Sequence, residues 1–182
     1  WRNFLKADPS VDLVHFTILR PPEKQDATPV RELSLIAFPI RELFEVKIKE
    51  FDLIIFDRYR RRGVLPGIYL ENIVRYVENG GAVLTAAGPA FATQMGLSRS
   101  ALGDILPGAP TGNEIEQGLK PSITESGNRH PVTADLAAAG DAVPRWGRWF
   151  RQIEATKTRG HTLLNGVGDR PLLILDRVGE GR

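Results

Sequence analysis

The stretch Gly80–Ala92, GGAVLTAAGPAFA, has the pattern of a strand that ends abruptly in small residues. In many α/β enzymes such a strand end carries a nucleophile at the tip of a strained turn with small neighbours. Here Ala86–Gly88 supplies the small neighbours, and Thr85 supplies the only hydroxyl. Thr85 is β-branched, precedes the expected tip and has no histidine close in sequence to activate it. We interpret the stretch as a binding turn or plain backbone geometry, with catalysis by Thr85 as the weaker alternative.

A second group of polar residues follows the apolar segment Leu53–Phe56. Asp57 stands at its end, and the basic run RYRRR, Arg58–Arg62, comes directly after it. Arginine binds carboxylate and phosphate groups through a bidentate fork, so Asp57 and Arg58 could position an anionic or sugar-like ligand. The alternative is a solvated loop whose charges keep the domain in solution, which is the commoner role of such runs.

Histidine and cysteine usage limits the available chemistry. The chain has no cysteine, which excludes disulfides, thiolate zinc sites and cysteine nucleophiles. Its histidines, His15, His130 and His161, match no metal-ligand spacing, and we expect neither a metal nor a cofactor. His130 precedes Pro131 in a long polar region. It is the candidate site histidine because loops carry function, with a structural hydrogen-bonded histidine as the alternative.

Length and composition indicate an ordinary globular chain. Its 182 residues are 42% hydrophobic and 25% charged, which suits one domain over residues 1–182 with a sizeable core. The formal net charge of +2 lacks the clustered excess of a nucleic-acid-binding protein, so we expect no nucleic-acid partner. No apolar run approaches the roughly 20 residues that cross a bilayer. The partner that Asp57 and Arg58 suggest is instead a small polar or anionic ligand.

The candidate site residues are positioned by a predicted strand–helix–strand unit. Leu53–Phe56 and Ala82–Ala87 have the continuous apolar character of parallel strands. Between them, apolar residues repeat at the spacing of one helix face: Leu70, Ile73, Val74 and Val77. Pro66 favours the start of this helix, and Gly80 favours its end. Such a unit is parallel, and ligands of open α/β sheets bind beyond the carboxyl ends of the strands.

Further elements are predicted on both sides of this unit. We expect a strand over Val11–Leu19, a helix from Pro39 to Glu50, and mostly loop with short extended pieces over residues 107–131. The segments RWGRWFRQIEATKT, HTLLNGV and PLLILDRV predict strands joined by glycine turns. The aromatic segment Trp146–Phe150 either offers a platform for a sugar, a peptide or a neighbouring domain, or packs its rings on the core.

Several phrases of the sequence together resemble a known family. They are DPSVDLVHFTILRPPEKQDATPVRELSLIAFP, EFDLIIFDRYRRRGVLP, YVENGGAVLTAAGP, RHPVT, WGRWFR and PLLILDRVGEGR. The chain resembles, over essentially its whole length, the glutamine amidotransferase-like domain of large bacterial membrane-anchored proteins. The resemblance implies an α/β fold, a flavodoxin-like three-layer sandwich with a mostly parallel sheet, with extra edge strands in the C-terminal half. It also implies a strand upstream of Trp1, another strand and helix beyond Arg182, and transmembrane helices elsewhere in the parent protein.

The resemblance also carries an expectation about function. Working members of this superfamily use a cysteine at the strand-end turn, and that turn falls here at Ala86–Ala87, where no cysteine stands. The chain is therefore expected to be a catalytically silent module that binds a ligand or the other domains of the same membrane-anchored protein. Its candidate ligand-binding residues are Asp57, Arg58, Thr85, Ala87, Gly88 and His130. The alternative is a hydrolase or amidotransferase of the same fold that uses a non-cysteine nucleophile or residues outside this chain.

Overall fold

The computed structural model describes residues 1–16, 38–136 and 145–182, which belong to two compact units, Trp1–Pro39 and Ile40–Arg182. In the first unit, helix α1 (Arg2–Lys6) is followed by a turn. Residues 11–16 form no strand, so the strand predicted over Val11–Leu19 is absent from its described part, and its remainder lies outside the described residues. Their side chains are mostly exposed, and their backbone pairs with no strand that the structure describes. Neither burial nor strand pairing therefore stabilises an extended conformation here.

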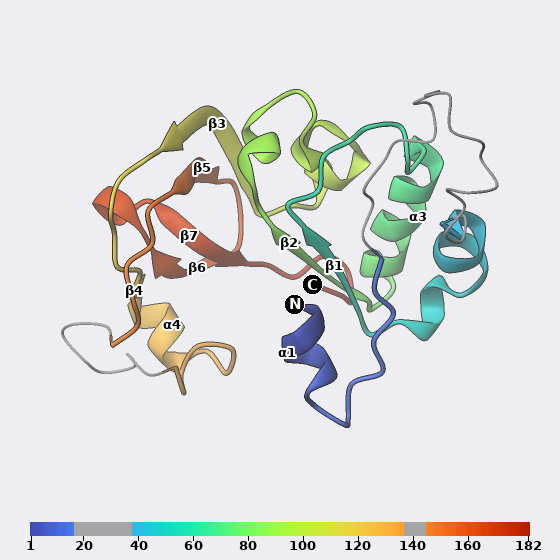
Figure 1. The fold of residues 1–182 in the computed structure, drawn as a ribbon, viewed down its shortest axis with the longest axis horizontal. Helices are drawn as coiled ribbons and strands as arrows, with labels where there is room; N and C mark the ends of the chain where they lie inside the picture. The colour runs from blue at the N-terminus through green and yellow to red at the C-terminus, as the bar shows by residue number, and fades with distance from the viewer. Residues whose placement is uncertain (17–37, 137–144) are drawn as a thin grey trace. The chain divides into compact units, whose positions relative to one another are not determined.

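The second unit contains two regular helices and seven strands among its described residues (Figure 1). The helices are α3 (Gly67–Glu78) and α4 (Glu125–Arg129). The strands are β1 (Leu53–Asp57), β2 (Ala82–Ala86), β3 (Gly108–Ile115), β4 (Ser122–Ile123), β5 (Gln152–Lys157), β6 (His161–Asn165) and β7 (Pro171–Leu175). Single helical turns lie at Glu42–Val46, Ile48–Glu50, Pro89–Ala92, Leu97–Arg99, Ala101–Asp104 and Val167–Asp169. No described helix is long and apolar enough to cross a membrane.

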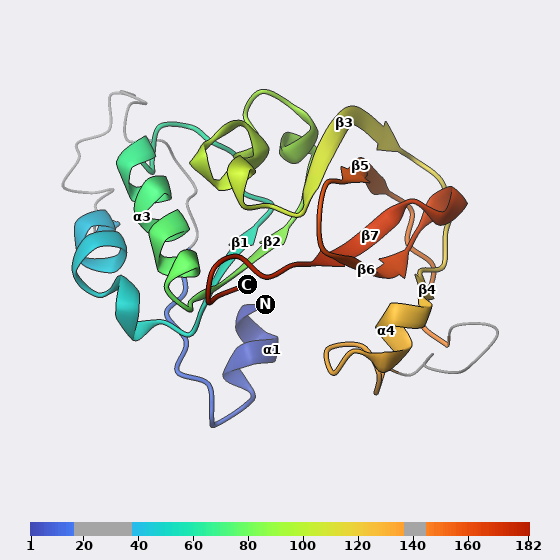
Figure 2. The same ribbon diagram turned by 180° about the vertical axis from the view of Figure 1, so that it is seen from behind.

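The predicted strand–helix–strand unit is confirmed. Strands β1 and β2 pair in parallel, from Leu53 opposite Ala82 to Asp57 opposite Ala86. Helix α3 connects them and lies alongside the pair in both views (Figure 1, Figure 2). The helix begins directly after Pro66, and the chain turns after it at Gly80, whose φ of 110° is unfavourable for any residue with a side chain.

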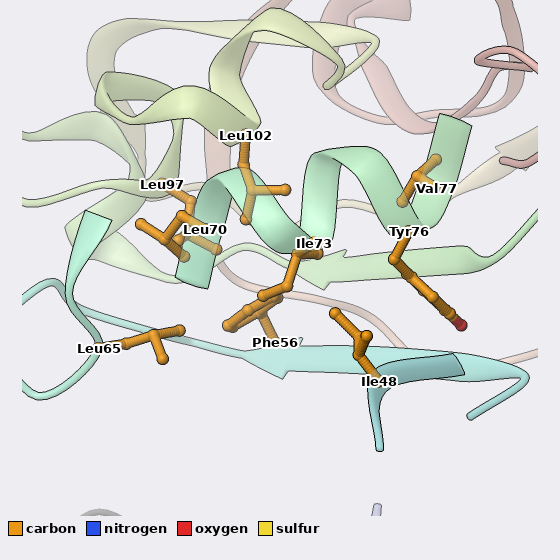
Figure 3. Packing of buried hydrophobic residues seen from close by; sticks show 9 residues of the cluster. All are labelled: Ile48, Phe56, Leu65, Leu70, Ile73, Tyr76, Val77, Leu97 and Leu102. Atoms are coloured by element: carbon orange, nitrogen blue, oxygen red, sulfur yellow. The ribbon is translucent and has the colours of Figure 1, made fainter. Parts of the chain in front are cut away.

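The hydrophobic core of the second unit lies between α3, β1 and the single helical turns around them (Figure 3). Leu70, Ile73 and Val77 of α3 are almost completely buried, as the predicted helix face requires. Phe56 of β1 packs into the same cluster. The cluster is made up of Ile48, Phe56, Leu65, Leu70, Ile73, Tyr76, Val77, Leu97 and Leu102. Burying a side chain of this kind stabilises a fold by about 1.5–3 kcal/mol, so this cluster fixes α3 against β1.

The predicted flavodoxin-like sandwich with a mostly parallel sheet is wrong for this chain. In the described residues the parallel sheet has only the strands β1 and β2. The C-terminal strands do not extend its edge but form two antiparallel sheets, β3–β5 and β4–β6–β7. One physical reason is the short link between β6 and β7, where Gly168 and Asp169 both adopt left-handed backbone angles. A link of this length joins antiparallel strands, because a parallel connection needs a crossover of a dozen residues or more.

Two further predictions need correction. The helix expected from Pro39 to Glu50 is broken at Lys47 into a π-helical turn, Glu42–Val46, and a 3₁₀ turn, Ile48–Glu50. The region 107–131, expected to be mostly loop with short extended pieces, contains the longer strand β3 and helix α4 as well as the short strand β4. Strand β3 is mostly exposed, and its register against β5 shifts between Pro110 and Glu114. Its sequence, GAPTGNEI, lacks the alternating apolar pattern that identifies strands, which is why the sequence did not predict it.

Candidate ligand-binding site

The carboxyl ends of β1 and β2 lie side by side, as the predicted site requires. Asp57 is the register partner of Ala86, and the backbone N–H of Arg58 donates to the carbonyl oxygen of Ala86 over 2.8 Å. Arg58 then adopts a φ of 47°, a left-handed conformation that is uncommon for a residue with a side chain. The chain therefore turns sharply away from the sheet directly after the last strand hydrogen bond.

Gly88 faces this turn from the segment that follows β2. A Cβ at position 88 would lie 2.9 Å from Cγ of Arg58, 3.0 Å from its Cβ and 3.3 Å from its Cα. Contacts this short with the base of a side chain and with backbone require a shift of one segment. The glycine is thus needed for close approach, since its own φ of −119° is open to any residue. This contact brings the Arg58 turn and the segment after β2 together.

The charged side chains at this position are exposed and only partly paired. Nε of Arg58 lies 3.6 Å from Oδ1 of Asp57, with the arginine side chain 76% exposed. Arg61 is occupied elsewhere, because its guanidinium and its backbone N–H donate to the carbonyl oxygens of Arg99 and Met95 respectively. Arg60 and Arg62 form no ion pair with any described residue. Exposed guanidinium groups can bind a phosphate or carboxylate group through charge-assisted hydrogen bonds.

Tyr59, within the basic run, has a structural role. Its ring packs edge-on against Phe56, with 5.3 Å between ring centroids. Burial raises the pKa of the Tyr59 hydroxyl above its usual value. The partly buried ring belongs to the margin of the core.

Thr85 and Ala87 differ in their surroundings. Thr85 is the register partner of Phe56, so both side chains lie on the sheet face that packs against α3. Asp57 and Ala86, one position further along, lie on the opposite face. Oγ1 of Thr85 is buried and has no hydrogen-bond partner among the described residues, so no base is placed to take its proton. Ala87 is exposed at the end of the strand.

His130 lies on a different part of the second unit. It follows α4, which contacts β4 and β6 (Figure 1). Nδ1 of His130 accepts the backbone N–H of Val132 over 3.2 Å, and its carbonyl oxygen accepts from Thr133 and Ala134. These bonds are local turn bonds, which correspond to the structural alternative. The structure thus brings together Asp57, Arg58 and Gly88 with Ala87 beside them, and neither Thr85 nor His130 contributes a side-chain hydrogen bond there.

The sequence reasoning missed a polar cluster around Glu154 on β5. Its carboxylate accepts from Thr111 Oγ1 at 2.7 Å, from Asn113 Nδ2 at 2.8 Å and from Arg170 Nε at 2.6 Å. The hydrogen bonds from Asn113, Thr111 and Arg170 lower the pKa of Glu154 to about 2. The partners come from distant parts of the chain, so no local signal could have predicted the cluster. With its oxygens already bonded, this carboxylate holds β3 and the β6–β7 link to β5.

The aromatic segment Trp146–Phe150 combines both readings that the sequence left open. Nε1 of Trp146 donates to the carbonyl oxygen of Pro121 over 3.0 Å, which ties that ring to the fold. Trp149 bridges to Leu119 through backbone bonds, yet 47% of its surface is exposed, and Phe150 is 71% exposed. The rings of Trp149 and Phe150 therefore remain accessible to solvent.

A scan against protein-family models finds no match for this chain, and a comparison with curated proteins finds no relative. Within residues 1–16, 38–136 and 145–182, no three histidine or acidic side chains gather in a way that could hold a metal ion. The site at the ends of β1 and β2 must therefore be interpreted from its own residues: an exposed arginine, a neighbouring carboxylate and a glycine-containing turn.

Proposed function

We propose that this chain is a non-catalytic binding module, related to glutamine amidotransferase-like domains, that holds a small anionic ligand at the carboxyl ends of β1 and β2. In this proposal Arg58 pairs with the anionic group, Asp57 accepts hydrogen bonds from polar groups of the same ligand, and the turn at Ala87–Gly88 offers backbone N–H groups. The module's other partners are further domains of a membrane-anchored protein.

The observation that carries the proposal is the position of Arg58. Its backbone is held left-handed by the bond to Ala86, and Gly88 leaves room for the base of its side chain. Residues in sparsely populated backbone conformations persist only where their surroundings hold them, and they cluster at binding sites. The guanidinium at the end of this fixed stem is 76% exposed and its one described ionic partner is 3.6 Å away. An anion of suitable size can therefore approach it from solvent.

The chemistry of the turn supports a binding role over a catalytic one. By the family resemblance, the turn that carries the nucleophile in amidotransferases falls at Ala86–Ala87, and the chain has no cysteine. The nearest hydroxyl, on Thr85, is buried without a hydrogen-bond partner among the described residues. Nucleophilic catalysis needs a base within hydrogen-bond reach of the attacking group, and no described residue supplies one to Thr85.

A titration followed by amide chemical shifts tests the proposal, with inorganic phosphate and succinate as probes. We expect at least one of them to shift the amide signals of Arg58, Ala87 and Gly88 in a saturable way. Arg58→Gln should weaken that binding about tenfold, because a charge-assisted hydrogen bond is lost. Arg177→Gln, which removes the same charge at another exposed arginine, should leave the affinity unchanged. Equal weakening by both variants, or no saturable shift with either probe, would refute the assigned site.

The enzymatic alternative is tested separately by ammonia release from glutamine and by hydrolysis of simple esters and amides. The proposal predicts no turnover above the buffer rate. Turnover that disappears in Thr85→Ala or Asp57→Asn would show that the chain is an enzyme.

A further inference from the structure

The segment that leads into β5 carries an exposed aromatic ring (Figure 1). Phe150 is 71% exposed, although a side chain of this kind is usually buried. Its neighbour Trp149 exchanges two backbone hydrogen bonds of 2.8 Å with Leu119, which is the pattern of an antiparallel pair. Directly opposite residues share a face of such a pair, and successive residues alternate between its faces. Trp149 therefore lies on the face of the buried Leu119, and Phe150 lies on the other face.

The residue opposite Phe150 is Gly118, which has no side chain to cover the ring. A Cβ at position 118 would lie 3.5 Å from Nη1 of Arg148 and 3.8 Å from both Cδ1 and Cε1 of Phe150. The Arg148 guanidinium and the edge of the Phe150 ring therefore both approach the bare backbone of Gly118. All three residues are exposed. Together, Gly118, Arg148 and Phe150 make up the outer aromatic face of this strand pair.

The charge on the outer aromatic face is that of Arg148, whose guanidinium forms no ion pair with any described residue. The carboxylates of β3 and its continuation are already paired. Nε of Arg151 lies 2.6 Å from Oε1 of Glu114, and Nη2 of Arg151 lies 2.8 Å from Oε1 of Glu116. An exposed guanidinium can bind a carboxylate through two parallel hydrogen bonds. The charge pattern therefore favours an anionic partner over a neutral or cationic one.

The composition and openness of this face are typical of contacts between proteins. Arginine and large aromatic residues are enriched at the positions that dominate the binding energy of protein interfaces. Small molecules bind in concave sites that bury most of their surface, whereas all three residues of the outer aromatic face are exposed. A neutral sugar would need acceptors for its hydroxyl groups, and the carboxylates of Glu114 and Glu116 already bind Arg151. The face therefore fits a polypeptide that presents a carboxylate next to an apolar side chain.

We propose that the outer aromatic face is a docking surface for an acidic polypeptide segment of a partner protein, with an apolar side chain beside its carboxylate. The carboxylate pairs with the Arg148 guanidinium, and the apolar side chain packs on the Phe150 ring. The missing side chain at Gly118 lets both groups of the partner approach together. This inference does not rest on the proposed anion site at the ends of β1 and β2.

Titration of the full chain with short peptides, followed by amide chemical shifts, tests this proposal. The probe is acetyl-Gly-Asp-Phe-Asp-Gly-amide, and two comparison peptides replace both aspartates by asparagine or the phenylalanine by alanine. We expect the probe to shift the signals of Gly118, Arg148 and Phe150 in a saturable way, and each comparison peptide to bind about fivefold more weakly or worse. No saturable shift, or equal binding of the three peptides, would overturn the proposal. Tighter binding of galacturonic-acid oligomers or single-stranded DNA at the same signals would assign the face to another partner and overturn it as well.

Substitutions on the protein identify which group reads which part of the peptide. Arg148→Gln should bind the aspartate and asparagine peptides equally, and Phe150→Ala should bind the phenylalanine and alanine peptides equally. The matched controls, Arg177→Gln and Phe4→Ala, remove the same groups from other exposed positions and should keep both preferences of the unmodified chain. Preferences that persist in Arg148→Gln and Phe150→Ala, or that disappear in the controls, would refute the assigned face.

Gly118→Asp tests the geometry without removing either group. The φ of Gly118 is not left-handed, so the backbone accepts a side chain, and the new carboxylate would lie within reach of the Arg148 guanidinium. Gly118→Asp should weaken binding of the acidic peptide about tenfold, whereas Gly118→Asn, of the same size, should weaken it less than about threefold. Equal effects of the two substitutions would contradict the role of Arg148. Phosphate and succinate binding at Arg58 should stay unchanged in all these variants, so the docking surface and the proposed anion site are tested independently.

Discussion

Gly88 and Arg58 are in such close contact that position 88 has no room for a side chain. A Cβ there would lie 2.9 Å from Cγ of Arg58, which belongs to the part of the side chain nearest the backbone. Because Arg58 is itself held in a left-handed conformation, it cannot move aside without losing its bond to Ala86. The two residues therefore fix one another, and the exposed guanidinium takes its direction from this contact.

The first prediction concerns Gly88→Ala. The added methyl should displace the Arg58 turn, lower the free energy of unfolding by about 1–3 kcal/mol and weaken anion binding. Urea unfolding measures the first effect, and the phosphate and succinate titrations measure the second. Gly67→Ala is the control, because a Cβ there meets nothing within 4 Å and should change stability by less than about 0.5 kcal/mol. Similar losses in the two variants would contradict the close-contact argument.

The second prediction concerns the buried hydroxyl of Thr85. Thr85→Val keeps the shape of the side chain and removes an oxygen that no described residue satisfies. We expect the free energy of unfolding to rise by about 1 kcal/mol, because an unsatisfied buried polar group is costly. Thr85→Ser keeps the hydroxyl, loses one methyl group and should lower stability by about 0.8 kcal/mol. A loss of stability in Thr85→Val would mean that the hydroxyl has a bonded partner.

The third prediction concerns pH. The pKa of Glu154 is about 2 in the folded protein, below the ordinary value of 4.5, because Asn113, Thr111 and Arg170 donate to its carboxylate. The unfolded chain binds more protons between these values, so the stabilisation from Glu154 is complete above pH 4.5 and is lost as the pH falls toward 2. Glu154→Gln should be less stable than the unmodified chain at neutral pH, and the difference should shrink on acidification.

Urea unfolding at a series of pH values measures this effect. Asn113→Ala removes one donor and leaves Thr111 and Arg170 in place, so its pH dependence should lie between those of the unmodified chain and Glu154→Gln. A stability difference between Glu154→Gln and the unmodified chain that stays constant down to acidic pH would show that Glu154 does not contribute through its charge.

The fourth prediction compares two tyrosines of α3. The Tyr76 hydroxyl donates to the carbonyl oxygen of Phe51 over 2.8 Å and accepts the N–H of Ala82 over 3.2 Å. Tyr76→Phe should lower the free energy of unfolding by about 1–3 kcal/mol, because two partly buried backbone groups lose their partner. The Tyr69 hydroxyl bonds to no described residue, and Tyr69→Phe should be nearly neutral. Equal effects of the two substitutions in urea unfolding would contradict this assignment.

The part of the fold that the sequence predicted correctly is the part with strong local signals. Helix α3 has a clear apolar face, a proline before its start and a glycine after its end, and apolar segments stand on both sides. Each of these signals acts over a few residues, so tertiary contacts did not need to be known. The same local reasoning placed Asp57 and Arg58 at the carboxyl end of β1.

The errors have a different origin. Strand β3, with the sequence GAPTGNEI, has few apolar residues and depends on pairing with β5, more than forty positions away in places. The pairing partners of the C-terminal strands are likewise non-local, and the family resemblance suggested a parallel sheet that this chain does not form in its described residues. The surroundings of Thr85 also depended on register, because one residue along a strand reverses the face.

The Tyr76 hydroxyl helps to set the register between β1 and β2. Its two bonds reach the residues leading into β1 and the first residue of β2, and the ring packs against Gly81 so closely that a Cβ there would lie 2.2 Å from it. A slip of one residue would move one acceptor or donor by about 3.3 Å, beyond reach of the same oxygen. Through Tyr76, helix α3 therefore stabilises the observed register of β1 and β2 over registers shifted by one residue.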